Sequence, residues 1–293
     1  MIRLIRRFRR LASTNYNRAA ELVELFNDRK NLISEGKIPY LDGFLCGQGF
    51  MLKPLQGMNL DTAKRPFVNL VEICASKYNK DNITVIDVGA NIGQTSIIFA
   101  SLEKVNKVLA YEPFPDSLKY LRKNVQSNHY EKIDVLPYGL FSESKKISMG
   151  FPKRISMLKY FDRYELGMKT VYHSNISSEI MCDFKKGDEC GELMNANPDI
   201  IKIDVEGSEI DVLIGLSNII REFMPFLLIE CNSNTLKNAN KSIKNIFSIV
   251  KEYGYSSAYP FSSSLDYSVS KDSLIRIENI ILKKISEDFV FIP

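Results

Sequence analysis

The feature that most constrains the fold is a short apolar run that leads directly into a turn containing glycine. The run ends at Val88, Gly89 follows at once, and Gly93 opens a segment with a helical pattern. A continuous apolar run of this kind is typical of a parallel strand buried on both faces. In open α/β sheets, ligands bind where such strands end. The motif therefore predicts a strand, a ligand-binding turn and a helix, and an ordinary corner without a ligand is the simpler alternative.

Apolar β-branched runs and helical patterns alternate along the rest of the chain. Because successive parallel strands need crossover connections, this alternation predicts a doubly wound α/β sheet of the Rossmann-like type. The expected strands lie at 84–88, 107–111, 133–136, 200–205 and 226–230. Helices are expected from the glycine turn to about residue 101, and at 115–125, 208–223 and 236–253. The tail is expected to add two strands, near 257–261 and 278–283.

Two segments depart from this alternation. Residues 1–65 contain a helical pattern near 14–30 and a glycine-rich stretch, and we expect them to form an N-terminal helical cap. Residues 66–293 are then expected to form the main domain. Within it, residues 142–198 are longer than one crossover helix requires. Because insertions of this kind commonly carry binding functions, we expect this segment on the substrate side.

The end of the second expected strand indicates a ligand with a ribose. Glu112 and Pro113 follow the strand, and an acidic residue at this place can accept hydrogen bonds from both ribose hydroxyls. Asn91 stands where dinucleotide-binding proteins have their second glycine, which argues against a nicotinamide cofactor. A charged residue at a strand end is also common without any ligand, so the assignment depends on the glycine turn upstream.

A third motif places charges near the end of the fourth expected strand. The period of two along a strand puts Lys202, Asp204 and Glu206 on one face. Charges among isoleucine and valine are costly unless they are paired and lie near a cleft. An Asp/Glu pair there could position an acceptor and take a proton from a hydroxyl. Alternatively, Lys202 pairs with a carboxylate and the cluster only shapes the turn.

The combination of these motifs resembles the FkbM family of class I methyltransferases. The segments IDVGANIG, YEP, IKIDVEGSE and LLIEC carry the resemblance, which covers about residues 66–285. The resemblance implies a seven-stranded sheet whose last strand is antiparallel, with S-adenosylmethionine as cofactor. It also implies O-methylation of a hydroxyl on a glycan, a glycolipid or a natural-product-like small molecule.

The resemblance also implies roles for individual residues. The reacting centre is assigned to Asp204 and Glu206, with Lys202 beside them, and no metal site is expected. One departure lies on the substrate side, where residues 182–189 replace the Thr-Leu-Asp-Asp-like element usual in the family. The cofactor contacts are assigned to Asp87, Gly89, Ala90, Asn91, Gly93, Glu112, Pro113, Tyr138, Gly139 and Asp204.

The charge distribution argues against a nucleic-acid substrate. The net charge is +4, and five arginines fall within the first ten residues, so the rest of the chain is close to neutral. A neutral body gives no electrostatic footprint for a phosphate backbone. Two alternatives stay open: an RNA ribose 2′-O-methyltransferase, because Lys202 and Asp204 match part of the residue set of such enzymes, and a non-catalytic cofactor-binding scaffold.

The N-terminal residues and the cysteines bear on location. Residues 1–12 form a basic amphipathic pattern that could lie on an anionic inner-membrane surface, and we favour a solvated or partner-packed terminal helix over this contact. The five cysteines form no C-x-x-C pair, which indicates reduced thiols. With no apolar run of membrane-spanning length, the sequence predicts a cytoplasmic protein.

Overall fold

The computed structural model describes most of the chain from residue 60 onward and three short strands before it. The described residues are 40–41, 44–47, 50–51, 60–128, 130–152, 171, 176–261, 275–276 and 286–293. The expected helix near 14–30 and the basic segment 1–12 lie outside the described residues. None of the helices in the described ranges is both long and apolar enough to span a bilayer.

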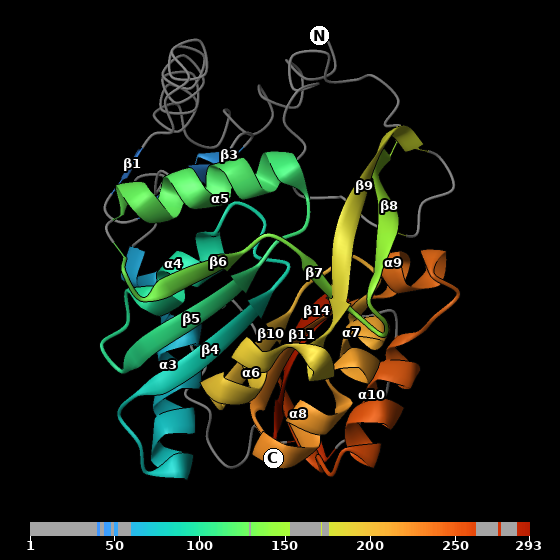
Figure 1. Ribbon diagram of the computed structural model, residues 1–293. Coiled ribbons are helices and arrows are strands. Elements are labelled where there is room, and N and C mark those ends of the chain that lie inside the picture. Colours follow the sequence, from blue (N-terminus) through green and yellow to red (C-terminus); the bar gives the residue numbers. More distant parts are fainter. Residues whose placement is uncertain are drawn as a thin grey trace, which may run out of the picture.

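An eight-stranded sheet forms the centre of the molecule (Figure 1). Its order is β13-β12-β14-β11-β10-β4-β5-β6, and the five strands from β11 to β6 are parallel. Their bounds are β4 Ile83–Val88, β5 Val105–Tyr111, β6 Ile133–Leu136, β10 Ile200–Ile203 and β11 Phe226–Asn232. All six residues of β4 are buried, which explains the continuous apolar run that opens the glycine motif.

The C-terminal strands confirm the predicted antiparallel last strand. This strand is β14, Ser286–Ile292, which lies antiparallel to both β11 and β12, Ser257–Phe261. Its position differs from the expected 278–283, a segment that lies outside the described residues. A further strand of two residues, β13, Ile275–Arg276, pairs with β12 and makes the eighth.

Helices cover both faces of the sheet (Figure 1). Successive residues of β4 point to opposite faces, so Val85 packs into one hydrophobic core and Ile86 into the other. The first core is completed by α3 Leu60–Tyr78, α4 Gln94–Ala100 and α5 Pro115–Ser127. The second is completed by α6 Gly191–Ala196, α7 Glu209–Gly215, α8 Ser217–Phe223, α9 Ser233–Asn238 and α10 Ile243–Glu252. This two-sided burial confirms the doubly wound fold.

Two expected helices are each divided into two. The segment 208–223 breaks at Leu216, between α7 and α8. At this break Gly215 lies against β7, and a Cβ on Gly215 would stand 1.9 Å from the carbonyl oxygen of Phe141. The segment 236–253 likewise begins within α9 and contains α10, and Asn240, with a φ of 55°, lies between the two helices. The long helix α3 was not predicted from the sequence.

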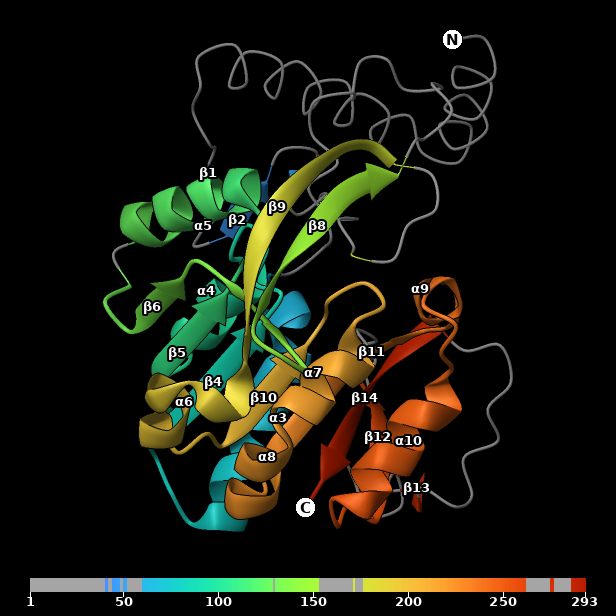
Figure 2. The same cartoon turned by 45° about the vertical axis from the view of Figure 1, so that its right-hand side comes forward.

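A second, three-stranded sheet comes from the segment between β6 and β10. It consists of β7 Gly139–Phe141, β9 Ile176–Lys186 and β8 Lys145–Pro152, in the order β7-β9-β8. Figure 2 shows β8 and β9 rising together beyond the carboxyl ends of the parallel strands. The unusual stretch 182–189 forms the end of β9 and a short 3₁₀ helix, η1, Gly187–Glu189. There Asp188 caps α8 by accepting hydrogen bonds from the N–H groups of Asn218 and Ile219, at 3.1 and 3.2 Å.

A third sheet of three short strands lies near the N-terminus. Its strands are β1 Tyr40–Leu41, β2 Phe44–Gly47 and β3 Phe50–Met51, and both pairings are antiparallel. They occupy the glycine-rich stretch that the sequence analysis assigned to the cap.

Candidate active site

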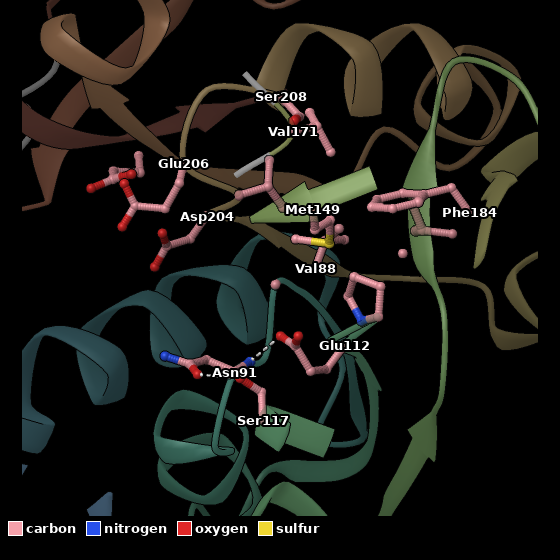
Figure 3. A pocket seen from close by; sticks show the side chains of 16 residues that line it. Val88, Asn91, Glu112, Ser117, Met149, Val171, Phe184, Asp204, Glu206 and Ser208 are labelled. Atoms are coloured by element: carbon pink, nitrogen blue, oxygen red, sulfur yellow. Dashed lines mark hydrogen bonds between the residues drawn. The ribbon is translucent and has the colours of Figure 1, made fainter. Parts of the chain in front are cut away.

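A cavity of about 210 Å³ opens where β4, β5, β10 and β11 end. Figure 3 shows Asn91, Ser117 and Glu112 on one side and Asp204 with Glu206 on another. Met149 from β8 and Phe184 from β9, both in the small sheet, also line the cavity. The cavity therefore lies at the place where open α/β sheets bind their ligands.

Glu112 organises the side of the cavity next to β5. Its side chain is 6% exposed, and one carboxylate oxygen accepts a hydrogen bond from the N–H of Asn91 at 2.8 Å. The other accepts one from the N–H of Phe114, also at 2.8 Å. Asn91 has a φ of 52°, and its side-chain oxygen accepts a bond from the Ser117 hydroxyl at 3.0 Å. Glu112 lines the cavity, so a ligand bound there meets this carboxyl group.

Gly89 brings the turn after β4 into contact with the turn after β10. Its φ is 83°, a conformation that suits glycine. A Cβ at this position would lie 2.0 Å from the backbone oxygen of Asp204. The N–H of Asp204 in turn donates to Val88 at 3.1 Å. The two loops that bear the site residues are thus held together by their backbones.

Asp87 and Lys202 form a buried network below the cavity. The Lys202 Nζ lies 3.1 Å from Asp87 and 3.2 Å from Asp204, and Asp87 also accepts a bond from the Ser96 hydroxyl at 2.6 Å. Burial alone would lower the pKa of Lys202, but the two carboxylates raise it above its usual value. Lys202 is therefore an ammonium that fixes Asp204, and its side chain does not line the cavity.

Three carboxyl groups meet at the side of the cavity next to β10 and β11. Asp204, Glu206 and Glu230 each place one carboxylate oxygen within 4.8 Å of the others. Burial, followed by the charges of Asp204 and Glu209, raises the pKa of Glu206 to about 7. Burial and four neighbouring carboxylates raise the pKa of Glu230 to about 9. The three carboxyls are thus close enough for the charge of one to affect the protonation of the others.

Glu209 holds the turn that presents Glu206. One of its carboxylate oxygens accepts a hydrogen bond from the N–H of Gly207 at 2.9 Å and a longer one from Val205 at 3.3 Å. Glu206 and Gly207 both have positive φ, 53° and 112°. The tight turn after β10 thus depends on a buried side chain and on a glycine.

The structure brings together most, but not all, of the residues assigned from the sequence. Six of the ten assigned cofactor residues, Gly89, Asn91, Glu112, Pro113, Gly139 and Asp204, line the cavity, as does the assigned catalytic residue Glu206. Asp87, Ala90, Gly93, Tyr138 and Lys202 do not.

Each of the residues outside the lining has a visible structural role. Gly93 has a φ of 92° and precedes α4, while Ala90 is buried against the first core. The hydroxyl of Tyr138 donates to the carboxylate of Glu192 on α6, which directs it away from the cavity. Asp87 is fully buried beneath the turn.

Several lining residues were not assigned from the sequence. Glu230 is the clearest, because it follows the apolar residues 226–229 of β11 as Glu112 follows the apolar end of β5. This parallel was a usable signal. Met149 and Phe184 had none, because they reach the cavity only through the pairing of β8 with β9.

The match of a protein-family model to residues 87–257 shows to which family the chain belongs. The Methyltransferase FkbM domain matches residues 87–257, more than half of the 293 residues and every strand end that lines the cavity. The chain belongs to the FkbM methyltransferase family. S-adenosylmethionine is therefore its cofactor.

Three proteins that resemble this chain have low sequence identity to it. Methyltransferase 1 of Beauveria bassiana is 26% identical over 149 residues, which cover 47% of this chain and 60% of that protein. The hexuronic acid methyltransferase AglP of Haloferax volcanii is 27% identical over 166 residues, covering 56% and 62%. The crystal structure of the FkbM methyltransferase from Methylobacillus flagellatus KT is 20% identical, with a TM-score of 0.43, and covers 72% of this chain and 44% of that one. The matched part thus spans less than two thirds of each of these proteins.

Proposed function

We propose that the chain transfers the methyl group of S-adenosylmethionine to a hydroxyl of a glycan, a glycolipid or a natural-product-like small molecule. The observation that carries this proposal is a single cavity with a ribose-type acceptor, Glu112, on one side and titratable carboxyls on the other. The distant relative AglP acts, by its name, on a hexuronic acid, which supports a carbohydrate acceptor.

The residues on the β5 side fit the cofactor. Glu112 lines the cavity at the end of β5, where an acidic residue can accept hydrogen bonds from both ribose hydroxyls. Pro113, Gly139 and the apolar Leu140 line the cavity nearby and suit the flat adenine ring. The bound cofactor supplies an electrophilic methyl group on a positively charged sulfur.

The residues on the β10 side fit the acceptor. A general base works best when its pKa lies near the working pH, and Glu206 meets this condition with a pKa of about 7. In this assignment Glu206 would accept the proton of the acceptor hydroxyl, which leaves the oxygen nucleophilic toward the methyl group that the bound cofactor would supply. Asp204, paired with Lys202 at 3.2 Å, orients the hydroxyl. Lys202 is then a positioning residue.

Residues 142–198, which were expected on the substrate side, contribute to the lining of the cavity. Met149, Val171 and Phe184, all from residues 142–198, line the cavity together with the carboxyls. We assign to this segment the contacts to the body of the acceptor, and to residues 66–293 the methyltransferase domain.

The test is methyl transfer from labelled S-adenosylmethionine to a panel of neutral and uronic glycans, with RNA as a separate arm. Glu206→Gln is expected to lower kcat by about 100-fold or more, because the base is lost. Its affinity for S-adenosylhomocysteine should stay within about two-fold of the wild type, because the fold is unchanged. Glu222→Gln, an exposed position on α8, serves as the matched control.

Three results would contradict the proposal. Wild-type turnover in Glu206→Gln would remove this residue from the mechanism. Transfer to RNA alone would replace the acceptor class, and cofactor binding without transfer to any acceptor would favour the scaffold alternative.

A further inference from the structure

Three carboxyl groups, those of Asp204, Glu206 and Glu230, line the acceptor side of the cavity, and the carboxyls of Glu209 and Asp288 act on Glu230 from beside it. Asp204 and Glu206 follow β10, Glu209 begins α7, and Glu230 lies near the end of β11. Asp288 on β14 is the direct register partner of Glu230. All four of the other carboxylates raise the proton affinity of Glu230. Near them the described residues place Lys202, whose ammonium is shared between Asp204 and Asp87.

Two of these carboxyls are incompletely satisfied. One oxygen of Glu230 and one of Glu209 are buried and have no hydrogen-bond partner among the described residues. Glu209 itself is fully buried. A buried carboxylate oxygen without a donor disfavours ionisation, and repulsion between close carboxylates acts in the same direction. The site therefore holds protons that a ligand with a positive charge could displace.

The cofactor that shares this cavity changes its charge during the reaction. S-adenosylmethionine carries a positive sulfonium, whereas the product S-adenosylhomocysteine carries a neutral thioether. The two ligands differ only in the transferable methyl group and in the positive charge that it places on the sulfur. The carboxyls of Glu206 and Glu230 line the same cavity as the cofactor-side residues Gly89 and Glu112.

We propose that binding of S-adenosylmethionine, and not of S-adenosylhomocysteine, displaces a proton from the Glu206–Glu230 pair. The inference rests on the proposed function, because it assumes that the acceptor side of the cavity faces the methyl donor. The cofactor would thereby ionise the base before the acceptor reacts.

The same coupling keeps the reaction balanced. The acceptor O–H bond breaks and its proton passes to the ionised carboxylate, while the acceptor oxygen bonds the methyl carbon. The C–S bond breaks, and its electron pair stays on the sulfur. With the positive charge gone, the carboxylate regains its affinity for the proton that it has just received. Glu206 is thus a base before transfer and a protonated acid after it.

The size of the effect follows from the titration of Glu206. With a pKa of about 7, Glu206 is half protonated at neutral pH. A ten-fold fall in its proton affinity, which is one pKa unit, releases roughly 0.4 of a proton per molecule at pH 7. Glu230, with a pKa of about 9, contributes mainly at higher pH.

Calorimetric titration of the full chain measures this release without an acceptor. Each ligand is titrated in buffers with different enthalpies of ionisation, with EDTA present to exclude metal ions. At pH 7 we expect roughly 0.4 of a proton released with S-adenosylmethionine and close to none with S-adenosylhomocysteine. Equal proton release with both ligands would overturn the inference.

Two variants assign the protons to residues. Glu206→Gln should remove the release at pH 7, and Glu230→Gln should remove the part that grows above pH 8. Glu222→Gln, the exposed control on α8, should leave both unchanged. Unaltered release in both site variants would also overturn the inference. Because no acceptor is present, the proton release can be measured whether or not the chain methylates a glycan, so failure of this inference can be told from failure of the proposed function.

Discussion

Glu112 is a residue whose role begins before any ligand binds. Its two carboxylate oxygens each accept a backbone N–H, from Asn91 and from Phe114, at 2.8 Å. It therefore fixes the turn after β4 and the chain after β5 at the same time. A ligand hydroxyl that bonds to Glu112 meets an acceptor that is already oriented.

The first residue-scale prediction concerns this carboxylate. Glu112→Gln keeps the size of the side chain but replaces one acceptor by an NH₂ group and removes the charge. We expect affinity for S-adenosylhomocysteine to fall by about 1.5–3 kcal/mol, the usual range for a hydrogen bond to a charged group. Calorimetric titration measures it, with Glu131→Gln, an exposed residue before β6, as the control. An affinity equal to that of the control would remove Glu112 from the ribose contact.

At this scale the sequence predicted acidic residues better than their partners. Glu112, Asp204 and Glu206 were assigned because a charge at the end of an apolar strand is conspicuous, and all three line the cavity. Lys202 was assigned to the reacting centre, with pairing to a carboxylate as the alternative. The structure shows that pairing, with Asp204 and with Asp87 on the neighbouring strand. Glu230 followed the same pattern as Glu112 and was overlooked.

At the scale of elements, the close approach of the turn after β4 to the turn after β10 holds the two sides of the cavity together. Gly89 combines a φ of 83° with a backbone oxygen that would lie 2.0 Å from any Cβ. Gly191, the first residue of α6, offers the opposite case, since a Cβ there would meet no atom within 4 Å.

The element-scale prediction compares these two glycines. Gly89→Ala should lower the free energy of unfolding by about 2–4 kcal/mol, because strain and a backbone clash add. Gly191→Ala should leave it unchanged or raise it by up to about 1 kcal/mol, because alanine is the better helix residue. Urea denaturation at one pH measures both variants. Equal stability of the two would show that the turns after β4 and β10 can separate freely.

The elements themselves were predicted where local pattern decides them. The parallel strands were found because both of their faces are buried, as in β4 and β10. The break between α7 and α8 was missed because it depends on the contact of Gly215 with β7. The small sheet was missed for the same reason, since β7 pairs with β9 across some forty residues of chain.

At the scale of the whole molecule, the parallel sheet gathers residues that are far apart in the chain. Gly89, Glu112, Asp204 and Glu230 come from the ends of four adjacent strands. The existence and burial of those strands could be predicted from the sequence, and with them the edge of the sheet that holds the ligand. The wall formed by β8 and β9 could not, because it depends on long-range pairing.

The central claim is that this cavity binds S-adenosylmethionine and its product, and does not bind a dinucleotide. The most direct measurement is calorimetric titration of the full chain with S-adenosylhomocysteine, with NADH titrated in parallel. The account predicts micromolar binding of S-adenosylhomocysteine and none of NADH, because Asn91 stands where a dinucleotide site needs a glycine. A folded protein that binds NADH, or that binds neither ligand, would contradict it.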